Sequence, residues 1–172
     1  MKKIIFFIFL ISTSTFAVDV AWWVNVEFKP TDTIIEGIPV AEIDNSWKYA
    51  TLLKRSIIPQ KALDSDRFDP MTEYNYKFAI EKDLNKNGVL EKIVTGVFED
   101  ENGNKGRFFL ILEKSKGKWK QLYLYKSGKK PGFNILKETD TGEIFWTYCM
   151  ECGMAGYIKW DGKKYYVKWK NT

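Results

Sequence analysis

The 172-residue chain contains no histidine, only two cysteines and only five prolines. The absence of histidine excludes Ser-His-Asp triads, Cys-His dyads and zinc sites with histidine ligands. The chain also lacks any apolar run of the ~20 residues that a transmembrane helix needs. With 45% hydrophobic and 28% charged residues, the composition predicts a soluble globular protein and excludes a disordered or collagen-like chain.

The amino terminus has the pattern of a secretory signal peptide. Lys2 and Lys3 precede the apolar run 4–11, and a polar segment then ends at Ala17. This order predicts export to the periplasm or the medium with cleavage after Ala17; a short anchor or a buried strand is the alternative. Loss of the two lysines lowers the formal net charge from +5 to +3. So small a charge predicts no nucleic-acid partner, and the mature chain has no predicted membrane span.

The mature chain, residues 18–172, is predicted to be a single mainly β domain. Residues 18–72 are irregular and hold four of the five prolines, whereas residues 73–172 consist of apolar segments separated by turn signals. Short strands joined by Asn-Gly, Pro-Gly and Asp-Gly turns predict an antiparallel meander, which forms a small barrel or a sandwich. The strands expected in this part are 74–80, 90–98, 107–112, 119–125, 133–136, 143–149, 157–160 and 165–169.

The first part predicts two strands and one short N-terminal helix. Residues 21–28 and 34–40 alternate enough to be strands. Residues 45–57 place their apolar side chains roughly on one helix face, after polar residues that can cap a helix, and Pro59 ends the run. Residues 60–72 are expected to be an irregular connection.

The most informative motif is a loop of oxygen-bearing side chains between two predicted strands. Asp83, Asn85, Asn87 and Glu91 occupy its positions one, three, five and nine, and Val89 offers its carbonyl at position seven. Calcium takes six to eight oxygen ligands, and this spacing can point four side chains inward. The alternative is a tight Asn-Gly hairpin whose first side chains bond the local backbone.

This loop resembles the calcium loops of FG-GAP and VCBS-type repeats, which read D-x-N/D-x-D-G-x-x-D ahead of an apolar strand. The resemblance covers residues 83–96 in a single copy and implies calcium as a cofactor. Asn87 stands where the family usually has aspartate, and Glu91 is one methylene longer than the usual residue. Because only two formal negative charges remain, the site implied is a weak one.

The two cysteines, Cys149 and Cys152, form a C-x-x-C pair near the end of the chain. In an exported protein, such a pair is expected to form a disulfide, here one that closes the turn between two strands. A thiol redox centre is the second interpretation, although the pair opens no predicted long helix. A metal site is the third, but the chain offers no other cysteine and no histidine as ligands.

The C-terminal hairpin is rich in aromatic side chains. Tyr165 and Trp169 share one face of its second strand, and Trp160 ends its first strand. These three side chains are either ordinary core residues or an exposed stripe that stacks sugar rings.

Three functional hypotheses follow from these features. The first is a non-enzymatic binding protein whose partner is a protein or a glycan, because no carboxylate pair, activated nucleophile or phosphate loop stands out. The second is a carbohydrate-binding module with a structural calcium loop. The third is a thiol–disulfide redox protein that uses the two cysteines.

Overall fold

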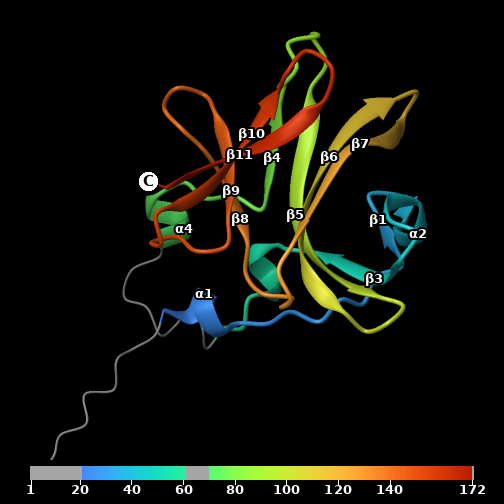
Figure 1. Cartoon of the computed structure of the whole chain (residues 1–172), viewed down its shortest axis with the longest axis vertical. Coiled ribbons are helices and arrows are strands. Elements are labelled where there is room, and N and C mark those ends of the chain that lie inside the picture. Colours follow the sequence, from blue (N-terminus) through green and yellow to red (C-terminus); the bar gives the residue numbers. More distant parts are fainter. Residues whose placement is uncertain (1–20, 61–69, 172) are drawn as a thin grey trace, which may run out of the picture.

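The computed structural model describes residues 21–60 and 70–171 (Figure 1). The predicted signal peptide and residues 61–69 lie outside this range. The described chain is mainly β, with antiparallel sheets of two, five and four strands and only short helical turns. The mainly β, antiparallel prediction is therefore confirmed. The barrel alternative is wrong, because the described strands form no closed barrel.

The five-stranded sheet has the order β3-β5-β6-β7, with β4 also paired to β5. Its bounds are β3 Trp47–Leu52, β4 Ala79–Lys82, β5 Glu91–Asp100, β6 Lys105–Ser115 and β7 Lys118–Ser127. β5 and β6 are apolar at successive positions, as expected of strands that are covered on both faces. Gly96 is required where it lies, because a Cβ there would be 2.3 Å from the ring of Phe108 on the neighbouring strand.

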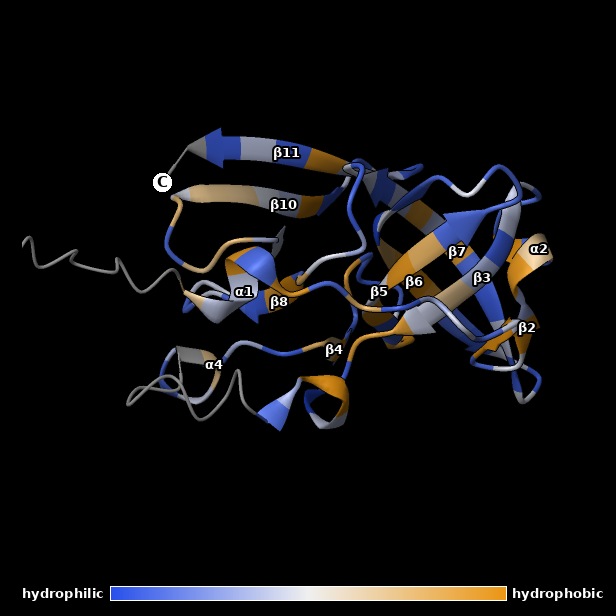
Figure 2. Cartoon of the chain, turned by 90° about the horizontal axis from the view of Figure 1, so that it is seen from below, coloured by the Kyte–Doolittle hydropathy of each residue, from blue (hydrophilic) through white to orange (hydrophobic). Residues whose placement is uncertain are grey.

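The four-stranded sheet has the order β11-β10-β9-β8. Its bounds are β8 Ile135–Glu138, β9 Ile144–Thr147, β10 Met154–Trp160 and β11 Tyr165–Asn171. Figure 2 shows β10 and β11 side by side as a long hairpin that extends away from β3, β5, β6 and β7. Each strand of this sheet overlaps a segment predicted from the alternation of apolar and polar residues.

Three hydrophobic clusters fill the interior, and the five-stranded sheet contributes to all of them. One lies under the small hairpin of β1 (Ile34–Ile35) and β2 (Ile38–Pro39) and the helical turn α2 (Val40–Ile43). The second packs α1 (Trp22–Asn25) and a residue of α4 (Pro70–Glu73) against Val97 and Phe133. The third joins β4, β5 and β6 to β8, β9, β10 and β11, so the two larger sheets share a core.

A buried polar junction also connects the two larger sheets. Asn134, just before β8, donates its Nδ2 hydrogens to the carbonyls of Gly96 at 3.1 Å and Gly132 at 3.3 Å. Its Oδ1 accepts the indole N–H of Trp146 in β9 at 2.9 Å. Ahead of β4, Lys77 exchanges two backbone hydrogen bonds of 2.8 Å with Leu136 of β8. The junction therefore satisfies polar groups that would otherwise be buried without partners.

The helix expected at 45–57 is wrong. Residues 47–52 form β3 against β5, and only Arg55–Ile57 make a 3-10 turn. Trp47 stacks on Phe98 of β5 with ring centroids 4.8 Å apart and planes 9° apart, and this long-range contact outweighs a loose local periodicity.

The strand expected at 21–28 is also wrong. Trp22 and Trp23 lie in the helical turn α1, and both are buried. A strand would have sent these neighbouring indoles to opposite faces, whereas the turn packs both into one cluster with Phe133. The segment 34–40 forms a hairpin of two very short strands, since the chain reverses at Glu36 and Gly37, both with positive φ.

Candidate functional site

The Asp83 loop joins β4 to β5, and its side-chain oxygens accept hydrogen bonds from its own backbone. Asp83 accepts the N–H of Asn87 on Oδ1 at 3.0 Å and the N–H of Gly88 on Oδ2 at 2.9 Å. The side chain of Asn85 also accepts the N–H of Asn87, and that of Asn87 accepts the N–H of Val89 at 2.7 Å. These contacts belong to the hairpin alternative.

Glu91, at position nine of the loop, is fully buried. It accepts the N–H of Leu84 on Oε2 at 2.7 Å and the hydroxyl of Tyr165 on Oε1 at 2.9 Å. Asn85 donates to the same hydroxyl at 3.0 Å. Burial, followed by the hydrogen bond to Glu91, raises the pKa of Tyr165 above its ordinary value. Glu91 and Asn85 therefore tie the loop to β11.

Calcium binding by this loop stays a prediction. Within residues 21–60 and 70–171, no group of three or more acidic or cysteine side chains is arranged to hold a metal ion. Calcium in this loop would also draw on the amide oxygens of Asn85 and Asn87 and on the carbonyl of Val89, which are neutral ligands.

Cys149 and Cys152 form a disulfide in the turn between β9 and β10. The disulfide prediction is therefore confirmed. Thr147 supports the same turn, because its hydroxyl lies 2.8 Å from the carbonyl of Cys149 and 2.9 Å from that of Met154. Cys149 is buried and Cys152 is exposed. A redox role for the pair stays a prediction.

The aromatic side chains singled out in the C-terminal hairpin belong mainly to the interior. Tyr165 is only 5% exposed and lies in the third cluster, with Trp160 packed against it. The ring of Trp169 also contacts the rings of Tyr125 and Trp146, but the Trp169 side chain remains 39% exposed. Ligand stacking at Trp160, Tyr165 and Trp169 stays a prediction, and Trp169 has the most accessible ring.

The opposite side of this sheet carries a row of aromatic and basic side chains that the sequence did not suggest. The strand register places Lys137 of β8 beside Phe145 of β9, Phe145 beside Tyr157 of β10, and Tyr157 beside Lys168 of β11. The neighbouring pair along these strands, Trp146 and Gly156, points to the other side of the sheet, where Trp146 is part of the core. We call the outer face the surface formed by Lys137, Phe145, Tyr157, Lys159, Lys168 and Lys170.

The rings of the outer face contact one another and its lysines. Phe145 and Tyr157 have centroids 5.6 Å apart at 48°, and Tyr76 meets the edge of Phe145 at 6.3 Å. The ammonium of Lys170 lies 4.6 Å from the centroid of Tyr157, and that of Lys137 lies 5.4 Å from the centroid of Tyr76. Both distances are within the range of cation–π attraction.

The outer face is electrostatically positive. Glu143 lies beside it and accepts a hydrogen bond from Lys159. That bond, followed by the charges of Lys159, Lys170 and Lys168, lowers the pKa of Glu143. Glu143 therefore pairs with one of the four lysines, Lys159. A second carboxylate, Glu151, acts on Tyr76, whose pKa is raised by burial first and then by Tyr74 and Glu151. Within the described chain, Lys137 and Lys168 make no ion pair.

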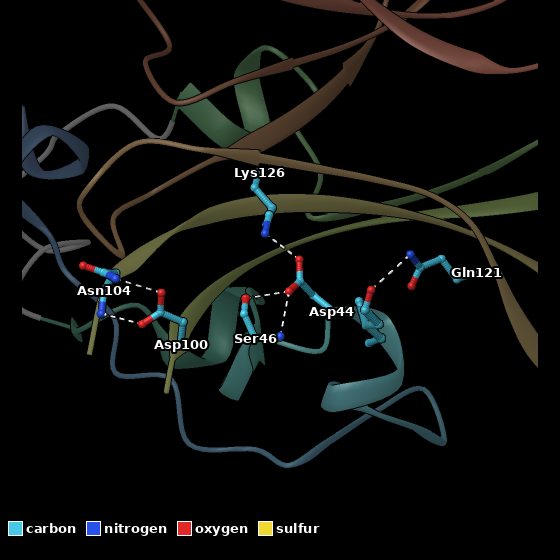
Figure 3. A network of polar contacts seen from close by, with 7 residues as sticks. Asp44, Ser46, Asp100, Asn104, Gln121 and Lys126 are labelled. Carbon is cyan, nitrogen blue, oxygen red and sulfur yellow. Dashed lines mark hydrogen bonds and ion pairs between the residues drawn. The ribbon is translucent and has the colours of Figure 1, made fainter. Parts of the chain in front are cut away.

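A second polar cluster lies at the other end of the molecule, on β7 and the turn before β3 (Figure 3). Asp44 accepts hydrogen bonds from Lys126 at 2.5 Å and from the hydroxyl of Ser46 at 2.6 Å. Nearby, Asp100 is bonded to Asn104, which is the main cause of its lowered pKa. A cavity of about 690 Å³ adjoins this cluster and is also lined by Lys105, Lys129 and Lys130. Asp44 is bonded to Lys126 and Ser46, and Asp100 is bonded to Asn104, so these carboxylates hold turns of the chain in place.

No family model, curated protein or solved structure matches this chain. Among residues 21–60 and 70–171, no helix is both long enough and apolar enough to cross a membrane. The interpretation of function therefore depends on the chain's own surface chemistry.

Proposed function

We propose that the chain is an exported, non-enzymatic binding protein, periplasmic or secreted, and that it binds its partner through the outer face. The observation that carries the proposal is the row of Lys137, Phe145, Tyr157 and Lys168 across all four strands of one sheet. Aromatic residues are enriched where proteins bind partners, and half-buried rings among charged groups give both contact area and orientation.

The position of this row in the fold supports the proposal. Phe145 and Tyr157 are only half-buried, while their strand neighbours Ile144 and Ile158 are buried in the shared core. The buried side chains therefore hold the sheet in place, and the rings of Phe145 and Tyr157 are not part of that core.

Lysine footprinting tests the proposal without assuming a ligand. The purified protein is treated with an amine-reactive reagent, alone and with the cell-envelope fraction of the organism that encodes it, and each modified lysine is quantified by mass spectrometry. We expect Lys137, Lys168 and Lys170 to be protected by the fraction, whereas the control residues Lys129 and Lys130 stay reactive. Protection confined to the control residues, or no protection at all, would refute the proposal.

The carbohydrate-binding module with a calcium loop is the second candidate. The accessible ring of Trp169, next to Tyr125 and Trp146, favours it. In that case, the Trp169→Ala variant would lose retention on a glycan column, and chelation of calcium would weaken retention of the unaltered protein. If retention is instead lost in Tyr157→Leu and kept in Trp169→Ala, binding belongs to the outer face.

A further inference from the structure

We propose that the ligand of the outer face is an acidic polysaccharide, a chain of sugar rings that carry carboxylates. This inference rests on the proposed function, because it names the ligand class of the same surface. Three features carry it: the spread of the positive charges, the position of the aromatic rings and the type of the cations.

The positive charges extend across the full width of the sheet. Lys137 is on the strand at one edge and Lys168 is on the strand at the other, in the same row. Since neighbouring strands lie about 4.8 Å apart, three spacings separate their backbones by about 14 Å. A ligand that contacts both ends must carry several negative charges, as an acidic polymer does and a single small anion does not.

The middle of the row is aromatic. Phe145 and Tyr157 lie between the two lysines and offer apolar ring carbon. The faces of a sugar ring carry apolar C–H groups, while its edge carries hydroxyls and carboxylates. The ammonium groups of Lys170 and Lys159 lie 4.6 and 5.8 Å from the centroid of Tyr157, next to where the edge of a bound sugar would be.

The same details disfavour nucleic acid and lipid. Nucleic acids are bound largely through their phosphates. Phosphates are bound most strongly by the fork of arginine, and all four cations of the outer face are lysines. A lipid surface is held by apolar side chains that protrude, whereas Phe145 and Tyr157 are half-buried.

The test measures binding of the purified protein to two polymers with the same sugar backbone. Polygalacturonate carries the carboxylates, and highly methyl-esterified pectin has most of them blocked. We expect polygalacturonate to bind and the ester to bind at least tenfold more weakly. The double variant Lys137→Gln/Lys168→Gln should weaken polygalacturonate binding about tenfold. The matched double variant Lys129→Gln/Lys130→Gln, with the same change in charge, should bind as the unaltered protein does.

The contribution of the rings is tested by Tyr157→Leu and Phe145→Leu, with retained folding checked by circular dichroism. Each should weaken polygalacturonate binding while leaving binding of polyglutamate, which has charge but no sugar, unchanged. Equal binding of polygalacturonate, polyglutamate and single-stranded DNA would overturn the inference, as would equal losses in the two double-lysine variants. Footprint protection of the outer face without any binding of polygalacturonate would leave the proposed function standing and refute its acidic-polysaccharide ligand.

Discussion

Asn134 is the residue at which the two larger sheets are joined by polar contacts. Replacing it with alanine removes a donor to two buried carbonyls and the acceptor for the Trp146 indole. Each buried polar group left without a partner costs about 1–3 kcal/mol, so we expect Asn134→Ala to lower the free energy of unfolding by about 2–4 kcal/mol. Urea unfolding measures this loss. Asn102→Ala, at an exposed turn, serves as the control and should change stability little.

Asp44 gives a prediction about pH. Burial raises its pKa, but the hydrogen bonds from Lys126 and Ser46 outweigh burial and hold the pKa below its ordinary value of 3.8. A carboxyl group with a lowered pKa in the folded protein stabilises the fold above its unfolded pKa, and this contribution is lost as pH falls through the folded pKa.

We therefore expect Asp44→Asn to be less stable than the unaltered protein at neutral pH, by up to about 1 kcal/mol. The difference should shrink as the pH falls below 3.8. Melting temperatures across this range measure it, and Asp140→Asn, at an exposed position, is the control. A difference that does not change with pH would show that the charge of Asp44 contributes nothing.

The Asp83 loop is an element whose conformation is stabilised by side-chain contacts to its own backbone. Because Asp83 accepts the N–H groups of Asn87 and Gly88, Asp83→Ala should lower stability by about 1–2 kcal/mol even in chelator. Thermal unfolding with calcium and with chelator separates the two interpretations of the loop. A melting temperature that rises with calcium in the unaltered protein, and not in Asp83→Ala, would establish a metal site.

The turn between β9 and β10 has two supports, the disulfide and Thr147. The loop closed by Cys149 and Cys152 is very short, so its chain-entropy contribution is about 2 kcal/mol. We expect the double variant Cys149→Ala/Cys152→Ala to remain folded and to lose at most this amount. Chemical unfolding measures the loss, and reductant should then have no further effect on the variant. Complete unfolding of the variant would contradict the supporting role given to Thr147.

Across the whole molecule, features that depend on residues close together in the sequence could be predicted. Features that depend on how distant strands pair could not. The Asp83 loop was recognisable because its residues are consecutive, and the later strands because their turns are local. β3 was missed because the partner of Trp47 is Phe98, far along the chain. The outer face was missed for the same reason, since only the pairing of β8, β9 and β10 brings Lys137, Phe145 and Tyr157 together.

The single-domain prediction can be tested through the three clusters, since β5 contributes side chains to each of them and β6 contributes to the first and the third. Ile43, the last residue of α2, lies in the first cluster, and Ile111 lies in the third, between the two larger sheets. Ile43→Val and Ile111→Val should each lower stability by about 0.5–1.5 kcal/mol. Because the central strands are shared, each variant should shift one common unfolding transition rather than create a second one.

Tryptophan fluorescence and far-UV circular dichroism should then give coincident unfolding curves. If Ile111→Val separated the two curves, the two larger sheets would be independent units, and the outer face would belong to a sheet that folds separately.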